Sequence, residues 1–179
     1  MHTSHHIEPL QLDAVGPHPV LMPLYKRNYE LIRDGIKTHE FRKRYPTVPT
    51  IWYVMVAQPV WQVVARIKLG TPHHASVDQL VQSFDGVGCS RAAGIRSYFR
   101  DYSHGYAVPI EQVEECKPLS RSALPDLSRV PNDFLPLSLN ADLLGFLEEW
   151  FDSQSTGRLG PERPRSASST RARGSDDYG

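Results

Sequence analysis

The residues with the clearest potential for chemistry lie in one basic stretch between Lys26 and Arg44. This stretch contains seven basic residues against three acidic ones. Aromatic side chains are interleaved with them, at Tyr25, Tyr29, Phe41 and Tyr45. Phosphates require positive charge and unstacked bases require flat π surfaces, so this combination is typical of single-stranded nucleic-acid binding. The alternative is a solvated charged strand with ordinary core aromatics.

The spacing within this stretch narrows the candidate site. If residues 36–44 form a strand, its period of two places Glu40 and Arg42 on one face with Thr38 and Arg44, and puts Phe41 on the core side with His39 and Lys43. Lys37 arrives from the turn after Gly35 and can reach the same place. The guanidinium offers a donor fork to a phosphate or base edge, and the carboxylate accepts from an amino group. A structural salt bridge within this cluster is the competing interpretation. The ligand-binding residues we expect are Tyr25, Lys26, Lys37, Glu40, Arg42 and Arg44.

Secondary structure must position these side chains, and the flanking sequence predicts it. An apolar strand at Val20 to Met22 precedes an amphipathic helix of residues 25–34, and Gly35 stands where a left-handed C-terminal cap is needed. Two β-rich runs, Ile51 to Ala57 and Val60 to Leu69, are separated by a short break and predict an antiparallel hairpin.

The middle of the chain predicts two helices and a last strand. Ser76 begins a capping box, and Ser90 is the expected cap of the second helix. A strand from Gly105 to Cys116 follows, with Pro109 placing it at an edge or a bulge. His73, His74 and His104 are expected in exposed loops, although they lie where they could approach the site. The predicted class is α+β, a small antiparallel barrel, closed or half-closed, surrounded by helices.

Beyond residue 119 the composition changes. Residues 120–153 form a Pro-rich extension followed by an amphipathic helix that Asn140 caps. Its apolar stripe is expected to pack on the same domain, and the alternative is a partner or homodimer surface through Leu143, Leu147 and Trp150. Residues 1–18 are expected to be a flexible N-terminal segment, and residues 154–179, with five arginines and a single large aliphatic residue, a disordered tail.

Composition excludes several classes of function. The chain has 179 residues and a formal net charge of zero, so nucleic-acid binding must depend on a local patch. No apolar stretch is long enough to span a bilayer or to serve as a secretory signal, and the two cysteines are not needed as a disulfide framework, so we expect a cytoplasmic protein without membrane contact. The early histidines His2, His5 and His6 lack partners at ligand spacing, and no phosphate loop or zinc spacing occurs, so we expect neither metal nor cofactor.

The string GIKTHEFR, with Gly35, Lys37, Glu40 and Arg42, resembles the Gly-x-Lys-x-x-Glu-x-Arg motif of the ASCH domain family. The similarity extends to EFRKR, to IWYVMVAQPVWQVVARIKL and to YFRDYSHGYAVPIEQVEECKPL, and it covers residues 19–119. These segments resemble prokaryotic PUA-like proteins described as transcriptional regulators. The resemblance implies a PUA-like β-barrel and a cleft beside the motif that binds RNA or a modified nucleotide, with DNA as a further possibility.

Some ASCH proteins are enzymes, so the resemblance also carries an alternative. In the acetylcytidine amidohydrolase branch the position of Glu40 is a threonine thought to act as nucleophile, activated by the lysine that corresponds to Lys37. A carboxylate at this position favours the charged lysine and opposes its use as a base. Other members are reported as ribonucleases, for which Lys37 with Tyr53, or with another hydroxyl in the cleft, remains the candidate catalytic pair. The sequence therefore favours an RNA- or nucleotide-binding module, for which a regulatory role is one possibility. The alternatives are a hydrolase and a protein-interaction scaffold.

Overall fold

A computed structural model describes residues 17–155 of the chain, except 58, 60, 126 and 128–133. The expected segments 1–18 and 154–179 thus fall almost wholly outside the described residues. The regular elements, in chain order, are β1 (His18–Leu24), α1 (Lys26–Arg33), β2 (His39–Arg42), β3 (Thr50–Val56), β4 (Gln62–Leu69), β5 (His73–Ser76), α2 (Val77–Phe84), α3 (Ala92–Tyr98), β6 (His104–Ser120), β7 (Leu135–Pro136) and α4 (Ala141–Ser155), with 3₁₀ turns η1 (Arg121–Ala123) and η2 (Leu137–Leu139). No helix in this described part is long and apolar enough to cross a membrane.

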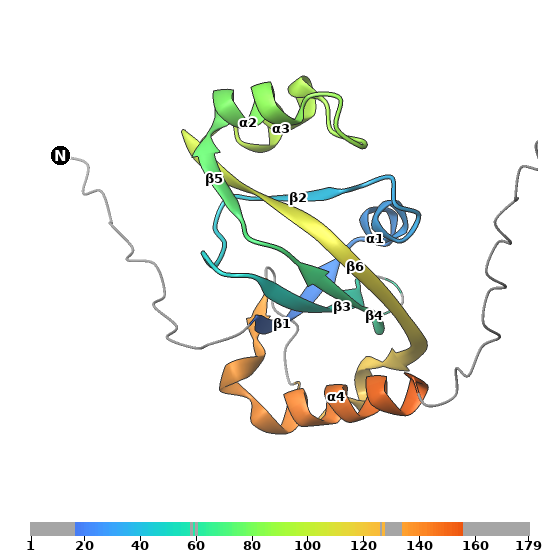
Figure 1. The fold of residues 1–179 in the computed structure, drawn as a ribbon. Coiled ribbons are helices and arrows are strands. Elements are labelled where there is room, and N and C mark those ends of the chain that lie inside the picture. Colours follow the sequence, from blue (N-terminus) through green and yellow to red (C-terminus); the bar gives the residue numbers. More distant parts are fainter. Residues whose placement is uncertain (1–16, 58, 60, 126, 128–133, 156–179) are drawn as a thin grey trace, which may run out of the picture.

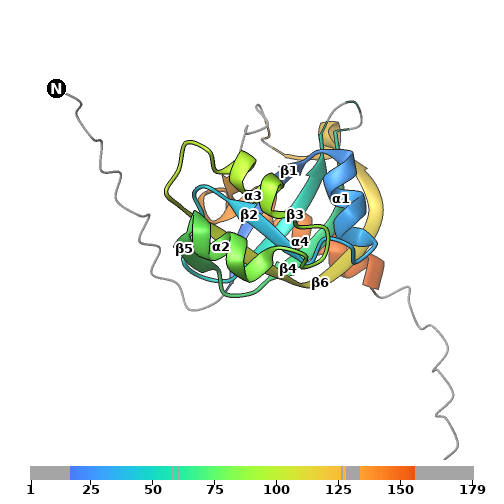
Figure 2. The same ribbon diagram turned by 90° about the horizontal axis from the view of Figure 1, so that it is seen from above.

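The strands form one curled sheet in the order β2-β6-β4-β3-β1-β7, and β5 pairs with the free side of β6. The sheet bends into a half-barrel, with α2 and α3 at one end and α4 at the other (Figures 1 and 2). The α+β class is confirmed. The wholly antiparallel sheet is wrong, because β1 and β3 run parallel from His18 opposite Thr50 to Leu24 opposite Val56. The long connection through α1 and β2 carries the chain back to the end at which β1 began, as a parallel pair requires.

Alternation along β3 separates two hydrophobic clusters. Trp52 and Val54 face the interior of the half-barrel, where they pack with Val20 and Met22 of β1. The intervening Tyr53 lies on the other face, in the cluster that α4 covers. The predicted β3–β4 hairpin is confirmed as an antiparallel pair. The two faces of one strand therefore have different partners, and this decides which side chains can reach the site.

Helix α4 packs on its own sheet. Asn140 caps it, since the Leu143 amide donates to Asn140 Oδ1 at 3.0 Å. Leu143, Leu147 and Phe151 are fully buried against the sheet face that carries Tyr53. A partner surface through Leu143 and Leu147 is therefore wrong: these side chains are already covered within the chain. Trp150 is partly buried, and its indole N–H donates to the Lys117 carbonyl at 3.3 Å.

Helices α2 and α3 cover the other end over a small cluster that includes Phe41 and Phe99. The capping box at Ser76 is confirmed by its reciprocal bonds with Gln79. The expected cap at Ser90 is wrong. Arg91 occupies the cap position, and the Asp85 carboxylate accepts from the Ala92 amide at 2.8 Å in place of a serine hydroxyl.

Strand β6 is longer and more central than expected. At Pro109 it changes partners: residues before it pair with β2 and β5, and residues after it pair with β4. The edge position is wrong, although a register irregularity does follow, opposite Lys68 and Leu69. His73 and His74 lie in β5, not in a loop, because the first half of β6 pairs with them.

Candidate nucleic-acid site at the end of β2

A left-handed turn delivers the candidate residues to β2. Gly35 has φ 70°, a conformation that glycine adopts at little steric cost, and its amide donates to the Ile32 carbonyl at 3.0 Å. The Lys37 amide then donates to the Leu31 carbonyl at 2.8 Å. These two bonds end α1 and direct the chain back over β2. Lys37 is thereby brought beside the strand that carries Glu40 and Arg42.

Lys37, Glu40 and Arg42 meet in a compact ion cluster. Glu40 is 6% exposed. Its Oε2 lies 2.6 Å from Lys37 Nζ, and its Oε1 lies 3.3 Å from Arg42 Nε. Among the described residues, Oε2 accepts no hydrogen bond. Its contact with Lys37 is close enough for an ion pair but does not have the geometry of a hydrogen bond. Two cations surround one carboxylate, and the cluster therefore carries one net positive charge.

The barrel interior holds the guanidinium of Arg42 in place. Its Nη2 donates to Met22 Sδ at 3.1 Å, and its Cζ lies 5.2 Å from the ring centroid of Trp52. Trp52 is itself fixed, because its indole N–H donates to the Tyr45 hydroxyl at 2.8 Å, and that hydroxyl bonds to Thr50. Burial raises the pKa of Tyr45 to about 12, which keeps this hydroxyl protonated at neutral pH. Arg42 is thus pre-positioned before any ligand arrives.

A pocket of about 390 Å³ opens where β2 ends. Helix α3 lies above this strand in Figure 1. Arg42, Lys43 and Arg44 line one side, and Tyr98 and Tyr102 line the other. Lys43 Nζ lies 5.2 Å from the ring centroid of Tyr98 and 4.8 Å from that of Tyr102. Both tyrosines are about 40% exposed. The pocket combines three cations with two accessible aromatic rings.

The structure distributes the six expected ligand residues over three places. Arg42 and Arg44 line the pocket. Lys37 and Glu40 lie behind Arg42, with side chains 16% and 8% exposed. Tyr25 and Lys26 stand apart at the start of α1: Tyr25 is 74% exposed, and Lys26 pairs with Glu30 at 3.7 Å.

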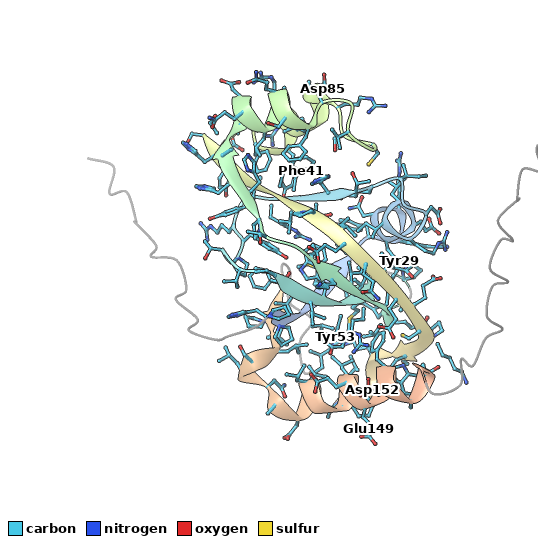
Figure 3. All side chains as sticks on the ribbon, viewed as in Figure 1. Tyr29, Phe41, Tyr53, Asp85, Glu149 and Asp152 are labelled. Atoms are coloured by element: carbon cyan, nitrogen blue, oxygen red, sulfur yellow. The ribbon has the colours of Figure 1, made fainter. Side chains whose placement is uncertain are left out.

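The catalytic pair of Lys37 and Tyr53 is wrong. Tyr53 is 2% exposed and faces α4, where its ring lies 5.5 Å from that of Phe151 (Figure 3). Lys37 joins the cluster beside Arg42, which contacts Trp52 on the opposite face of β3. The sheet itself separates the two side chains, so they cannot act on one ligand.

The ligand residues expected from the sequence do not include the tyrosine side of the pocket. As sequence, Tyr98 and Tyr102 are typical core or rim aromatics of which one could stack a base, and Lys43 is expected on the core side of its strand. Helical spacing could not have identified the two rings together, because α3 ends at Tyr98 and Tyr102 lies beyond it. In the part of the chain that the structure describes, no three His, Cys, Asp or Glu side chains are arranged to hold a metal ion.

Three solved structures from Zymomonas mobilis share this architecture. The protein named ASCH superposes with a TM-score of 0.62 at 18% identity, over 73% of this chain and 94% of the other. Two single-residue variants of it give TM-scores of 0.64 at 18% identity, over 74% of this chain and 95% and 97% of theirs. The chain has the ASCH fold.

The ASCH fold is established by structural likeness and not by sequence similarity. No family model matches the sequence, and no curated protein is significantly similar to it. In this ASCH fold the string GIKTHEFR forms the turn after α1 and the whole of β2. The motif that carried the sequence resemblance therefore leads directly into the pocket.

Proposed function

We propose that this chain binds single-stranded RNA in the pocket at the end of β2. The proposal rests on the position of Arg42, which belongs both to the ion cluster and to the pocket. The other residues that line the pocket are Lys43, Arg44, Tyr98 and Tyr102. Cations next to exposed rings suit phosphates next to unstacked bases. The likeness of both motif and fold to ASCH proteins supports RNA over other polyanions.

Each side of the pocket has a distinct role in this proposal. A base stacks on Tyr98 or Tyr102, and the flanking phosphates are neutralised by Lys43 and Arg44. Because Lys43 Nζ lies over both rings, an arriving base displaces it toward the phosphate. Arg42 presents its guanidinium to a phosphate or a base edge while Glu40 holds it from behind.

The roles of Lys37 and Glu40 are indirect. Their side chains are 16% and 8% exposed, so they position Arg42 and set the charge around it. Lys37 Nζ lies 2.6 Å from the Glu40 carboxylate and is engaged in this ion pair, which opposes its use as a general base. We therefore propose a binding module without a hydrolytic step.

Fluorescence anisotropy with a labelled single-stranded RNA decamer tests the proposal. Lys43→Ala should weaken binding by about 1 to 3 kcal/mol, the range for charge-assisted contacts. The matched control is Lys68→Ala, which removes an equal charge from a lysine that is 54% exposed on β4 and paired with Glu111 at 3.1 Å. Equal losses from both variants would indicate diffuse electrostatics and would refute the site.

Two further arms separate the alternatives. A DNA decamer of the same sequence should bind more weakly, and equal or tighter binding of DNA would refute the preference for RNA. RNA recovered from the binding reactions should be intact on a denaturing gel, and acetylcytidine incubated with the protein should be unchanged. Cleavage or deacetylation that Lys37→Ala abolishes would replace the binding module with a hydrolase.

A further inference from the structure

A row of aromatic rings leads from the barrel interior to the surface. It runs from Trp52 through Tyr45, Tyr106 and His74 to His104, with successive ring centroids 6.1, 6.4, 4.5 and 5.7 Å apart. The first two rings are buried, Tyr106 is half-buried, and both histidines are exposed. The rings of His74 and Tyr106 are stacked, with an interplanar angle of 27°. The row therefore ends in solvent with two neighbouring imidazoles, and the ring of His74 is stacked on that of Tyr106.

Strand register puts this histidine pair on the face that carries Arg42. Tyr106 of β6 is paired with Arg42 of β2 on one side and with His74 of β5 on the other. Directly paired residues share a face of a sheet, as do residues two apart on a strand, so His104 lies there too. His73 pairs with Ala107 and belongs to the opposite face, 6.1 Å from the ring of Phe84.

The histidine pair and the pocket lie at the same end of the sheet. Tyr102, which lines the pocket, precedes His104 by two residues, and β6 begins at His104. Because β2 runs antiparallel to β6, the chain beyond Arg42 continues toward the end at which His104 lies. Arg42 of the pocket and the two imidazoles therefore lie on one face of the sheet, at the end where β2 finishes and β6 begins.

We propose that the His104–His74 pair receives the nucleotides that follow the one held in the pocket. This inference rests on the proposed function and extends it from a one-base site to a track for a single strand of several nucleotides. Exposed rings supported from behind are the platforms on which successive bases stack. Every base has a π surface that can stack. The track should therefore raise the affinity for longer strands without selecting a particular base.

The experiment compares a diuridylate with a hexauridylate, both fluorescently labelled. His74→Ala and His104→Ala should each weaken binding of the hexauridylate by about five-fold or more, which is the lower end of the range for stacking one base on an aromatic ring. Each should change binding of the diuridylate by less than about two-fold. The matched control is His73→Ala, an adjacent histidine on the opposite face of the same strand. His74→Phe should restore hexamer binding, because it keeps a ring and removes the ionisable nitrogen atoms.

The outcomes separate this inference from the proposed function. If hexamer binding falls with Lys43→Ala but His74→Ala and His104→Ala behave like His73→Ala, the pocket stands and the track is wrong. A wild-type protein that binds hexamer no better than dimer also overturns the track. If neither oligonucleotide binds the wild-type protein, the proposed function itself fails. Thermal melting of each variant checks folding, and restoration by His74→Phe excludes a loss that comes from unfolding.

Discussion

Removing the Glu40 carboxylate should destabilise the fold far more than removing an exposed one. Glu40 is 6% exposed and lies between two cations, at 2.6 Å from Lys37 and 3.3 Å from Arg42. Their side chains are 16% and 14% exposed, so Glu40→Ala removes a shared carboxylate from two largely buried positive charges. Stranding a buried charge costs about 3 to 5 kcal/mol. Because both cations retain some contact with water, we expect about 3 kcal/mol.

Urea unfolding followed by circular dichroism at pH 7 measures this cost. With a slope of about 2 kcal/mol per molar urea, Glu40→Ala should lower the midpoint by about 1.5 M. The control Glu111→Ala removes a carboxylate from an exposed pair with Lys68, worth at most about 1 kcal/mol. Adding Lys37→Met to Glu40→Ala should recover part of the loss, since one stranded cation is then absent. Equal midpoints for Glu40→Ala and Glu111→Ala would refute the account of a buried charge cluster.

Three further predictions concern packing, pH and thiols. Leu147→Ala should cost about 2 to 5 kcal/mol of unfolding free energy, because the side chain is fully buried under the sheet, whereas Leu139→Ala, at a residue 80% exposed, should cost less than about 0.5; equal urea midpoints would contradict the packing of α4. Burial raises the pKa of Tyr45 from its ordinary 10 to about 12, so the folded state holds this proton more tightly and loses stability as pH rises from 10 to about 12; urea midpoints across this range should fall less steeply in Tyr45→Phe, and identical slopes would contradict the burial. Burial also raises the pKa of the Cys116 thiol to about 11, so Ellman's reagent at pH 8 should modify the exposed Cys89 rapidly and Cys116 slowly; a fast phase that survives Cys89→Ser would contradict this order.

Features encoded within a few residues were predictable from the sequence. The turn at Gly35, the capping box at Ser76 and the cap at Asn140 each depend on groups no more than about four residues apart, and each forms as expected. The meeting of Lys37 with Glu40 and Arg42 belongs to the same class, because one turn and one strand period decide it. Local geometry was sufficient for this half of the site.

Features that depend on distant partners were not predictable in the same way. Alternation shows that Tyr53 and Trp52 face opposite sides of a strand, but the sequence does not show that α4 covers the Tyr53 side. The cap of α3 came from Asp85, seven residues before the amide it accepts from, so a nearby serine was the misleading signal. The short strand at His73 exists because β6 offers it a free side. Such choices are made by tertiary pairing and not by local propensity.

The same limit applies to the pocket. Tyr98 and Tyr102 approach Lys43 because α2 and α3 fold over Phe41, and this packing depends on Gly105. A Cβ at Gly105 would lie 2.2 Å from the ring of Phe99. Only glycine therefore allows the strand to pass this close to the ring. The sequence contains the glycine, but not the identity of the ring that it makes room for.

Cross-linking of bound RNA tests the central claim most directly. A single-stranded RNA carrying 4-thiouridine would be bound, irradiated and digested, and the modified residues located by mass spectrometry. The account predicts cross-links in the pocket at Lys43, Tyr98 or Tyr102, with less product in Lys43→Ala than in Lys68→Ala. Cross-links concentrated instead at the hollow around Trp61 and Arg121, on another part of the surface, would contradict the assignment of the RNA site to the end of β2.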